Sequence, residues 1–109
     1  MKRGEIYLVE FPSSEGHEQR GLRPAIIFSE DTAGIISIIP FTAKASSIKY
    51  TYTLKVLKSK FNGLNEDSIA LIFQLRAIDK KRIKNKLGEL EGDLLNEINK
   101  LLIEMLKLK

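Results

Sequence analysis

The sequence predicts a mainly β fold with one C-terminal helix, an α+β protein, and two patterns carry this prediction. Between residues 4 and 90, short apolar runs alternate with turn-forming residues, as in strands joined by tight connections. From residue 94 onward, leucine and isoleucine recur at helical spacing. Many short strands and one helix indicate a small, strongly bent sheet or a partly open barrel.

Five strands are expected in succession, at residues 4–11, 24–29, 34–41, 49–57 and 68–78. The turn signals between them are Pro12-Ser13-Ser14, Glu30-Asp31-Thr32-Ala33-Gly34 and Asn62-Gly63-Leu64-Asn65. A helical turn at 80–84 and a last short strand at 87–90 follow. No internal repeat, low-complexity tract or linker interrupts the series, so we expect one domain over residues 1–109.

The apolar residues of the C-terminal segment fall on one face of a helix. They are Leu94, Leu95, Ile98, Leu101, Leu102, Met105 and Leu106. Asp93 near the start of this segment and Lys107 near its end suit the positive and negative ends of the helix dipole. Because no residue of the segment suggests chemistry, we expect it to cover an open face of the sheet.

Composition excludes several classes of site. The chain has 109 residues, no cysteine and one histidine. Disulfide scaffolds, thiol nucleophiles and cysteine metal sites are therefore excluded, and two histidines cannot act as an acid–base pair within one chain. The spacings of His and Cys metal sites are absent as well, so we expect neither a metal nor a cofactor.

Neither a membrane span nor a targeting segment is expected. No apolar run approaches the roughly 20 residues that a span needs. The first strand pattern begins directly after Met1-Lys2-Arg3-Gly4, which leaves no room for a signal peptide. We therefore expect a cytoplasmic protein.

Positive charge is concentrated in the middle of the chain. The net charge is +4, and residues 41–65 contain no Asp or Glu but hold Lys44, Lys49, Lys55, Lys58 and Lys60. Such a stretch can follow a phosphate backbone electrostatically. Alternatively, it is a solvated edge whose lysines discourage pairing between strands of different molecules.

The loop between the first two expected strands carries more polar groups than a turn needs. Residues 16–24 read Gly-His-Glu-Gln-Arg-Gly-Leu-Arg-Pro. Loops held by rigid strands are where binding and catalytic groups commonly lie. This loop is therefore the first candidate for a functional site.

Four motifs occur in a fixed order over nearly the whole chain. They are Arg3-Gly4-Glu5-Ile6-Tyr7, the loop Gly16–Pro24, Ile39-Pro40-Phe41-Thr42, and Phe73-Gln74-Leu75-Arg76-Ala77-Ile78-Asp79. In these motifs the chain resembles the MazF/PemK/Kid family of toxins, ribosome-independent endoribonucleases of toxin–antitoxin pairs. The resemblance implies an SH3-like small β-barrel of the MazF/CcdB kind with a C-terminal helix, assembled as a homodimer.

Arg23 and Thr42 are the expected catalytic residues. Attack by the 2′-hydroxyl of RNA builds negative charge on a crowded phosphorane, which a fixed cation stabilises. The planar donors of Arg23 match phosphate oxygens, and proton donation to the leaving 5′-oxygen is a second role open to it. The resemblance implies that the Thr42 hydroxyl acts beside it. Structural alternatives are an Arg23–Glu18 ion pair and a Thr42 that only forms strand or turn.

Further residues of the loop have expected supporting roles. Glu18 and Gln19 are expected to orient Arg23 and to hydrogen-bond RNA or the loop backbone. His17 and Arg20 are candidates for RNA contact, although His17 departs from the small or apolar residues common in resembling proteins. A lone histidine in a loop is also often simply exposed.

RNA contacts are also expected outside the loop. The candidates are Lys44, Ser46, Lys49, Gln74 and Arg76. Gln74 and Arg76 alternate with Phe73 and Leu75, so we expect them to share one face of the strand over 68–78. A solvated face of the barrel is the alternative.

The leading functional hypothesis is a metal-independent, sequence-specific endoribonuclease, or mRNA interferase. It would cut single-stranded RNA to leave a 2′,3′-cyclic phosphate and a 5′-hydroxyl, under the control of an antitoxin with an acidic, disordered tail. Two alternatives stay open. One is a CcdB-like toxin that binds DNA gyrase without enzymatic activity, and the other is a degenerate member that binds RNA or antitoxin without cutting.

Overall fold

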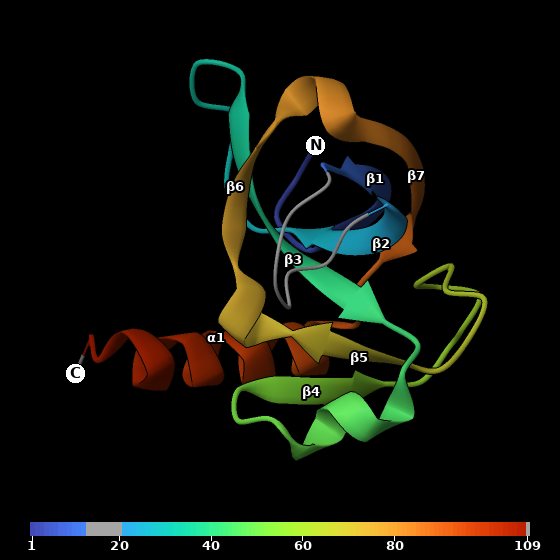
Figure 1. Ribbon diagram of the computed structural model, residues 1–109, viewed down its shortest axis with the longest axis vertical. Helices are drawn as coiled ribbons and strands as arrows, with labels where there is room; N and C mark the ends of the chain where they lie inside the picture. Colours follow the sequence, from blue (N-terminus) through green and yellow to red (C-terminus); the bar gives the residue numbers. More distant parts are fainter. Residues whose placement is uncertain (13–20, 109) are drawn as a thin grey trace.

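The computed structural model describes residues 1–12 and 21–108 (Figure 1). Within these residues, seven strands, three short 3₁₀ turns and one helix follow one another. They are β1 (Glu5–Phe11), β2 (Gly21–Ile27), β3 (Ile35–Thr42), η1 (Ala45–Lys49), β4 (Thr53–Val56), β5 (Ser68–Leu71), η2 (Ile72–Gln74), β6 (Arg76–Asp79), η3 (Lys80–Arg82), β7 (Ile83–Glu89) and α1 (Gly92–Leu106). The predicted mainly β class with a C-terminal helix is confirmed.

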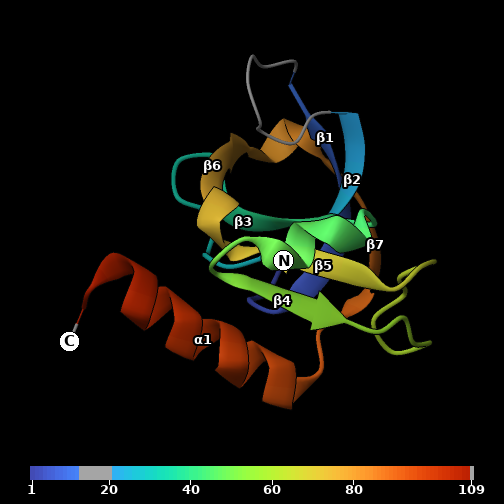
Figure 2. The same ribbon diagram turned by 60° about the horizontal axis from the view of Figure 1, so that its bottom comes forward.

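Strand β3 is the centre of the sheet. Its one edge pairs antiparallel with β2, and its other edge pairs with β6 at the start and with β5 at the end. The strand order is β4-β5-β3-β2-β1-β7, with β6 paired to β3 outside this path. Within the described residues no pairing joins β4 to β7, so the barrel is open. Both views show the strongly bent sheet (Figures 1 and 2).

The prediction of one continuous strand over residues 68–78 is wrong, because η2 divides this segment into β5 and β6. Continuing the register of Thr42 with Ile69 along β3 would set Ile38 opposite residue 73, but the partner of Ile38 is Arg76. The additional residues form the helical turn η2, which lets one segment pair with two parts of a bent strand. An interruption of this kind leaves no trace in apolar alternation.

Two more strand predictions need correction. The expected strand at 49–57 forms only over Thr53–Val56, because residues 45–49 form η1 and Tyr52 adopts a left-handed φ of 62°. The last strand is longer than expected, at Ile83–Glu89. The strands near 4–11, 24–29 and 34–41 and the helix are confirmed, with β2 beginning earlier, at Gly21. The expected helical turn at 80–84 forms over Lys80–Arg82 only, because β7 begins at Ile83.

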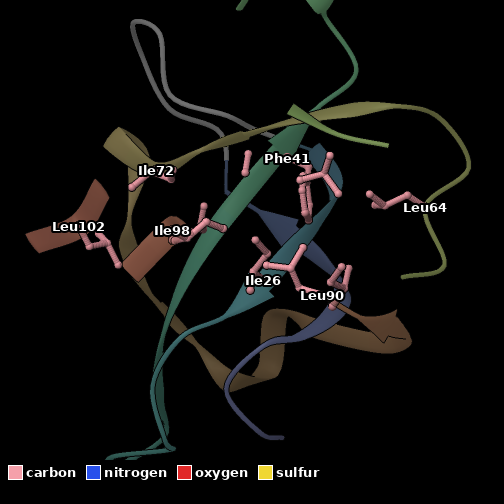
Figure 3. Packing of buried hydrophobic residues seen from close by; sticks show 11 residues of the cluster. Ile26, Phe41, Leu64, Ile72, Leu90, Ile98 and Leu102 are labelled. Carbon is pink, nitrogen blue, oxygen red and sulfur yellow. The ribbon is translucent and has the colours of Figure 1, made fainter. Parts of the chain in front are cut away.

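Alternation along the central strands places apolar residues on both faces of the sheet. One face joins α1 in a core that includes Ile6, Ile26, Ile39, Phe41, Ile72, Ile98 and Leu102. The close view shows Ile98 and Leu102 of the helix directed toward Ile26 and Ile72 (Figure 3). The opposite face curls around a second cluster of Val9, Phe11, Ala25, Ile27, Ile36, Ile38, Ile78 and Ile83. As expected, the helix covers one face of the sheet.

A buried carboxylate ties the first strand to the last. Glu5 is 8% exposed, and its Oε2 accepts a hydrogen bond from Lys86 Nζ of β7 at 2.6 Å. Its Oε1 accepts a second bond from the Lys2 backbone N–H at 2.5 Å. The bond from Lys86 foremost, and then the bond from Lys2, lower the pKa of Glu5. The hydrogen bond to Glu5 in turn raises the pKa of Lys86.

We predict that Glu5→Gln lowers stability at pH 7 and flattens its dependence on pH in acid. A carboxyl group whose pKa is lowered by folding stabilises the folded protein at pH values above its unfolded-state pKa of about 4.3. That contribution disappears as the pH falls through the lower pKa of the folded state. Urea unfolding between pH 7 and pH 3 measures the difference between variant and wild type.

Glu10→Gln is the matched control, because Glu10 lies on the same strand but is exposed and stands 4.0 Å from Lys84. Equal pH profiles for Glu5→Gln and the wild type would show that the Glu5–Lys86 pair does not stabilise the fold.

Candidate functional site

The end of β3 separates from β2, and a pocket forms between them. The pairing of the two strands stops where Ala25 lies opposite Pro40. The next residue of β2 is Pro24, which has no N–H to extend the ladder. Strand β2 stays paired with β1 as far as Gly21, whereas the end of β3 pairs with β5 on its other edge.

We call the space between the separated strand ends the strand-end pocket. Its volume is about 320 Å³, and it is lined by Leu8, Leu22, Arg23, Pro24, Phe41, Thr42, Ala43, Gly63, Leu64, Asn65, Glu66, Ser68 and Leu87. Continuing the register of Ala25 with Pro40 by two residues sets Arg23 opposite Thr42. The two expected catalytic residues therefore lie in the wall of one pocket.

A second pocket adjoins the first at Thr42, and we call it the aromatic pocket. Its volume is about 360 Å³, and it is lined by Thr42, Lys44, Ser47, Tyr50, Leu71, Phe73 and Gln74. The ring centroids of Tyr50 and Phe73 are 5.7 Å apart. The ammonium of Lys49 lies 5.4 Å from the centroid of the Tyr50 ring. Aromatic faces beside cations suit a flat, anionic ligand such as a nucleotide.

The hydroxyl of Thr42 is fixed at the junction of the two pockets. Thr42 is the last residue of β3 and is 7% exposed. Its Oγ1 accepts a hydrogen bond from the Lys44 backbone N–H at 3.2 Å. Because Oγ1 is the acceptor in this bond, its own hydrogen can be donated to a ligand.

The charges of the lining residues favour an anion. Arg23 is exposed in the strand-end pocket, and Lys44 is exposed in the aromatic pocket. Glu66 is the one carboxylate among the described residues that line either pocket. A phosphate placed near Thr42 would thus have cations on both sides.

The structure brings several predicted RNA-contacting residues together. Lys44 and Gln74 line the aromatic pocket, and Lys49 lies against its Tyr50 ring. Ser46 is exposed on η1, and the neighbouring Ser47 is the serine that lines the pocket.

The prediction that Gln74 and Arg76 share one face of a strand is wrong, since Gln74 ends η2 and Arg76 begins β6. The Arg76 guanidinium lies over the Phe11 ring, 5.1 Å from its centroid. Arg76 is not among the residues that line the two pockets. His17, Glu18, Gln19 and Arg20 lie outside the described residues, so their predicted roles stay predictions.

Sequence reasoning missed two parts of the site. One is the aromatic pair Tyr50 and Phe73, which the expected strands absorbed as ordinary strand formers. The signal for Tyr50 was its place next to Lys49 in a segment without acidic residues, whereas no such signal marked Phe73. The other part is the pair Asn65 and Glu66, which the loop over residues 57–67 supplies to the strand-end pocket.

The described part of the chain holds neither a candidate metal centre nor a membrane-spanning helix. No group of three or more His, Cys, Asp or Glu side chains in residues 1–12 and 21–108 is placed to hold a metal ion. Of the helices within those same residues, none is both long and apolar enough to cross a membrane.

Comparison with known proteins gives a consistent result. Residues 2–106 match the family model of the PemK-like, MazF-like toxins of type II toxin–antitoxin systems. A curated relative, the Endoribonuclease MazF of Staphylococcus saprophyticus, is 34% identical over 103 residues, which cover 91% of this chain and 85% of that protein.

Two solved structures from Deinococcus radiodurans show the same fold at 25% identity. One is MazF, with a TM-score of 0.81 over 98% of this chain and 96% of the other. The second is a MazE–MazF structure, with a TM-score of 0.77 over 100% and 97% of the two chains. The chain thus belongs to the PemK-like, MazF-like toxin family of type II toxin–antitoxin systems, and the resemblance drawn from its four motifs is confirmed.

Gly63 allows the 57–67 loop to approach β7, and Gly63→Ala is predicted to destabilise the protein. Its φ is +74°, and an added Cβ would lie 2.0 Å from the Leu87 carbonyl oxygen, which is backbone and cannot move aside. The left-handed φ alone costs about 1–3 kcal/mol, and the contact adds to it. Chemical denaturation measures the loss.

Gly92→Ala is the matched control, because Gly92 begins α1 and no atom of the surrounding fold lies within 4 Å of the place that an added methyl group would take. Alanine is the better helix former, so we expect stability to be equal or higher. Similar stability of Gly63→Ala and the wild type would contradict the close approach of the loop to β7.

Proposed function

We propose that this protein is an endoribonuclease that cuts single-stranded RNA at a short specific sequence, as the toxin of a toxin–antitoxin pair. One observation carries the proposal: Arg23 and Thr42 line one pocket, and Thr42 also lines the aromatic pocket with its lysine and rings. The name of the Staphylococcus saprophyticus relative, Endoribonuclease MazF, supports the same activity. The cytoplasm, where messenger RNA is translated, is the proposed place of action.

The proposed reaction is a transesterification within the RNA. The 2′-oxygen gives up its proton to solvent water and forms a bond to the adjacent phosphorus, while the bond from phosphorus to the 5′-oxygen breaks. The products are a 2′,3′-cyclic phosphate and a 5′-hydroxyl, so the leaving oxygen gains a proton. No metal ion is required by this proposal, because side-chain donors stabilise the charge of the phosphorane.

Arg23 and Thr42 divide the work at the phosphate. The guanidinium of Arg23 stabilises the added charge and is the proposed proton donor to the 5′-oxygen. The Thr42 hydroxyl donates a hydrogen bond to a non-bridging oxygen from its fixed place beside the Lys44 amide. Glu18 and Gln19 are proposed to orient Arg23.

The aromatic pocket is proposed to bind the neighbouring nucleotide. A base stacks on Tyr50 or Phe73, the Gln74 amide hydrogen-bonds its edge, and Lys44 and Lys49 neutralise phosphates. Unstacked bases of single strands present their edges for such reading. His17, Arg20, Ser46 and Arg76 are proposed as further RNA contacts along the strand.

A homodimer and an antitoxin are the proposed protein partners. Pairing two copies of a domain of this size buries apolar surface that one small core leaves exposed. An acidic, disordered segment would be attracted to Arg23, Lys44 and Lys49, and would compete with RNA for them. The MazE–MazF structure from Deinococcus radiodurans supports an antitoxin partner for a protein of this fold.

Incubating the purified protein with end-labelled RNA in excess EDTA tests the proposed function. We expect cleavage at few positions, with 5′-hydroxyl ends that polynucleotide kinase labels directly. Activity that requires added magnesium would contradict the metal-independent reaction. RNA binding without cleavage would indicate a degenerate member, and inhibition of DNA gyrase without RNA binding would indicate a CcdB-like toxin.

Arg23→Ala is predicted to lower the single-turnover cleavage rate by about 10²–10³-fold, the usual effect of removing one preorganised donor. Arg23→Lys should restore little of this, because an ammonium lacks the planar pair of donors. Circular dichroism and thermal melting should match the wild type, since Arg23 is exposed. A folded Arg23→Ala variant that cuts at the wild-type rate would remove Arg23 from catalysis.

Thr42→Val is predicted to impair cleavage by at least about tenfold while changing RNA affinity less. Valine keeps the branched shape but has no hydroxyl, and Thr42→Ser should recover most of the rate because it restores the donor. Thr32→Val is the control, since Thr32 lies in the exposed turn before β3 and lines neither pocket. Normal cleavage by Thr42→Val would make Ser47 the next candidate.

A further inference from the structure

The 57–67 loop is held by a buried polar network centred on Asn62. Asn62 is 0% exposed. Its Oδ1 accepts hydrogen bonds from the backbone N–H groups of Ser59 and Leu64, each at 3.0 Å. Its Nδ2 donates to the Leu57 carbonyl at 2.9 Å. One side chain thus fixes the backbone at three points of the loop.

The network extends to Glu91, the residue before α1. Ser59 Oγ donates to Glu91 Oε2 at 2.8 Å, and Asn62 Nδ2 lies 3.3 Å from Oε1. The loop is also bonded to the end of β7, since the Glu89 N–H donates to the Phe61 carbonyl at 3.0 Å. The carboxylate of Glu91 makes no capping hydrogen bond to the helix, and its bonds to Ser59 and Asn62 join it to the loop.

The far end of this loop forms one wall of the strand-end pocket. Gly63, Leu64, Asn65 and Glu66 all line it, together with Arg23 and Thr42. Leu64 is 6% exposed, and its side chain extends toward Phe41 in the core (Figure 3). The buried Leu64 thus anchors this wall of the pocket. Asn65 and Glu66 are exposed and follow directly. Their position is therefore set by Asn62 and Leu64 on the same short segment.

We propose that Asn62 and Glu91 are positioning residues for a specificity wall made by Asn65 and Glu66. This inference rests on the proposed endoribonuclease function. The wall faces the base next to the scissile phosphate and selects it by its edge. Glu66 accepts hydrogen bonds only, so it favours a base with an exocyclic amino group and disfavours uracil, whose edge has a single N–H donor between two carbonyl oxygens. Asn62 and Glu91 touch no RNA themselves.

A rigid wall is needed for this selection to work. A mobile polar group can hydrogen-bond to the edges of many different bases. A fixed polar group leaves the donors and acceptors of an unmatched base unsatisfied. A misplacement of about 1 Å can lower rate by up to about 10²-fold. Loss of the network should therefore change which sites are cut as well as how fast they are cut.

The test compares Glu91→Ala and Asn62→Ala with the wild type on a mixed RNA, and sequencing of the cut ends gives the cleavage sites. Both variants should cut a broader set of sites, and KM at the preferred site should rise by about 10-fold or more. Glu66→Gln should increase cutting beside uracil relative to the amino-bearing bases. Asp93→Ala is the matched control, since it removes a carboxylate from the same helix start but none from the loop network.

Thermal melting separates positioning from simple loss of stability. If Asn62→Ala does not fold, Glu91→Ala and Ser59→Ala decide the question. A folded Glu91→Ala with the wild-type site pattern and KM would overturn the inference, as would an unchanged base preference in Glu66→Gln.

Binding of oligonucleotides with 2′-deoxyribose at the cut position is measured in parallel. A wild type that binds these with base selectivity but cuts no RNA contradicts the proposed activity alone. The wall is then judged from the binding selectivity of the same variants. A wild type that neither binds nor cuts RNA contradicts both.

Discussion

The double pairing of β3 is the constraint on which the rest of the structure depends. One edge of this strand carries β2, and the other carries β6 and β5 in turn. A single strand with two sets of partners must bend, and its alternate side chains must then fill two cores, one under α1 and one inside the curl. Where the bend turns β3 away from β2, Pro24 offers no N–H donor to hold the two strands together. The strand-end pocket therefore opens between them.

The pocket is therefore a consequence of sheet geometry, with chemistry placed at its rim. Thr42 is the last residue of β3, and it is buried and hydrogen-bonded through Lys44, whereas Arg23 is exposed on a strand still held by β1. A fixed hydroxyl and an accessible cation suit a site that must admit a long anionic polymer. Side chains on rigid strands are positioned more precisely than side chains on free loops.

Local patterns predicted most of the fold and only part of the site. The strands near β1, β2 and β3 and the amphipathic helix were predictable because their apolar alternation reflects burial directly. The interruption at η2 was not, because it depends on where β3 bends, which no window of neighbouring residues contains. The site motifs pointed to Arg23 and Thr42, but Tyr50 and Phe73 were hidden among strand formers. Asn62 was seen only as a turn residue, since its partner Glu91 is distant in sequence.

The position of α1 in the chain has a consequence for biosynthesis. Ile98 and Leu102 complete a core whose other members, such as Ile26 and Phe41, are made much earlier. Chains emerge from the ribosome with the N-terminal part first. During translation one apolar face of the sheet therefore stays uncovered until the helix has left the exit tunnel. The sheet acquires its stable form only once the helix has packed on it, so the strands that carry Arg23 and Thr42 are made before the core beneath them is complete.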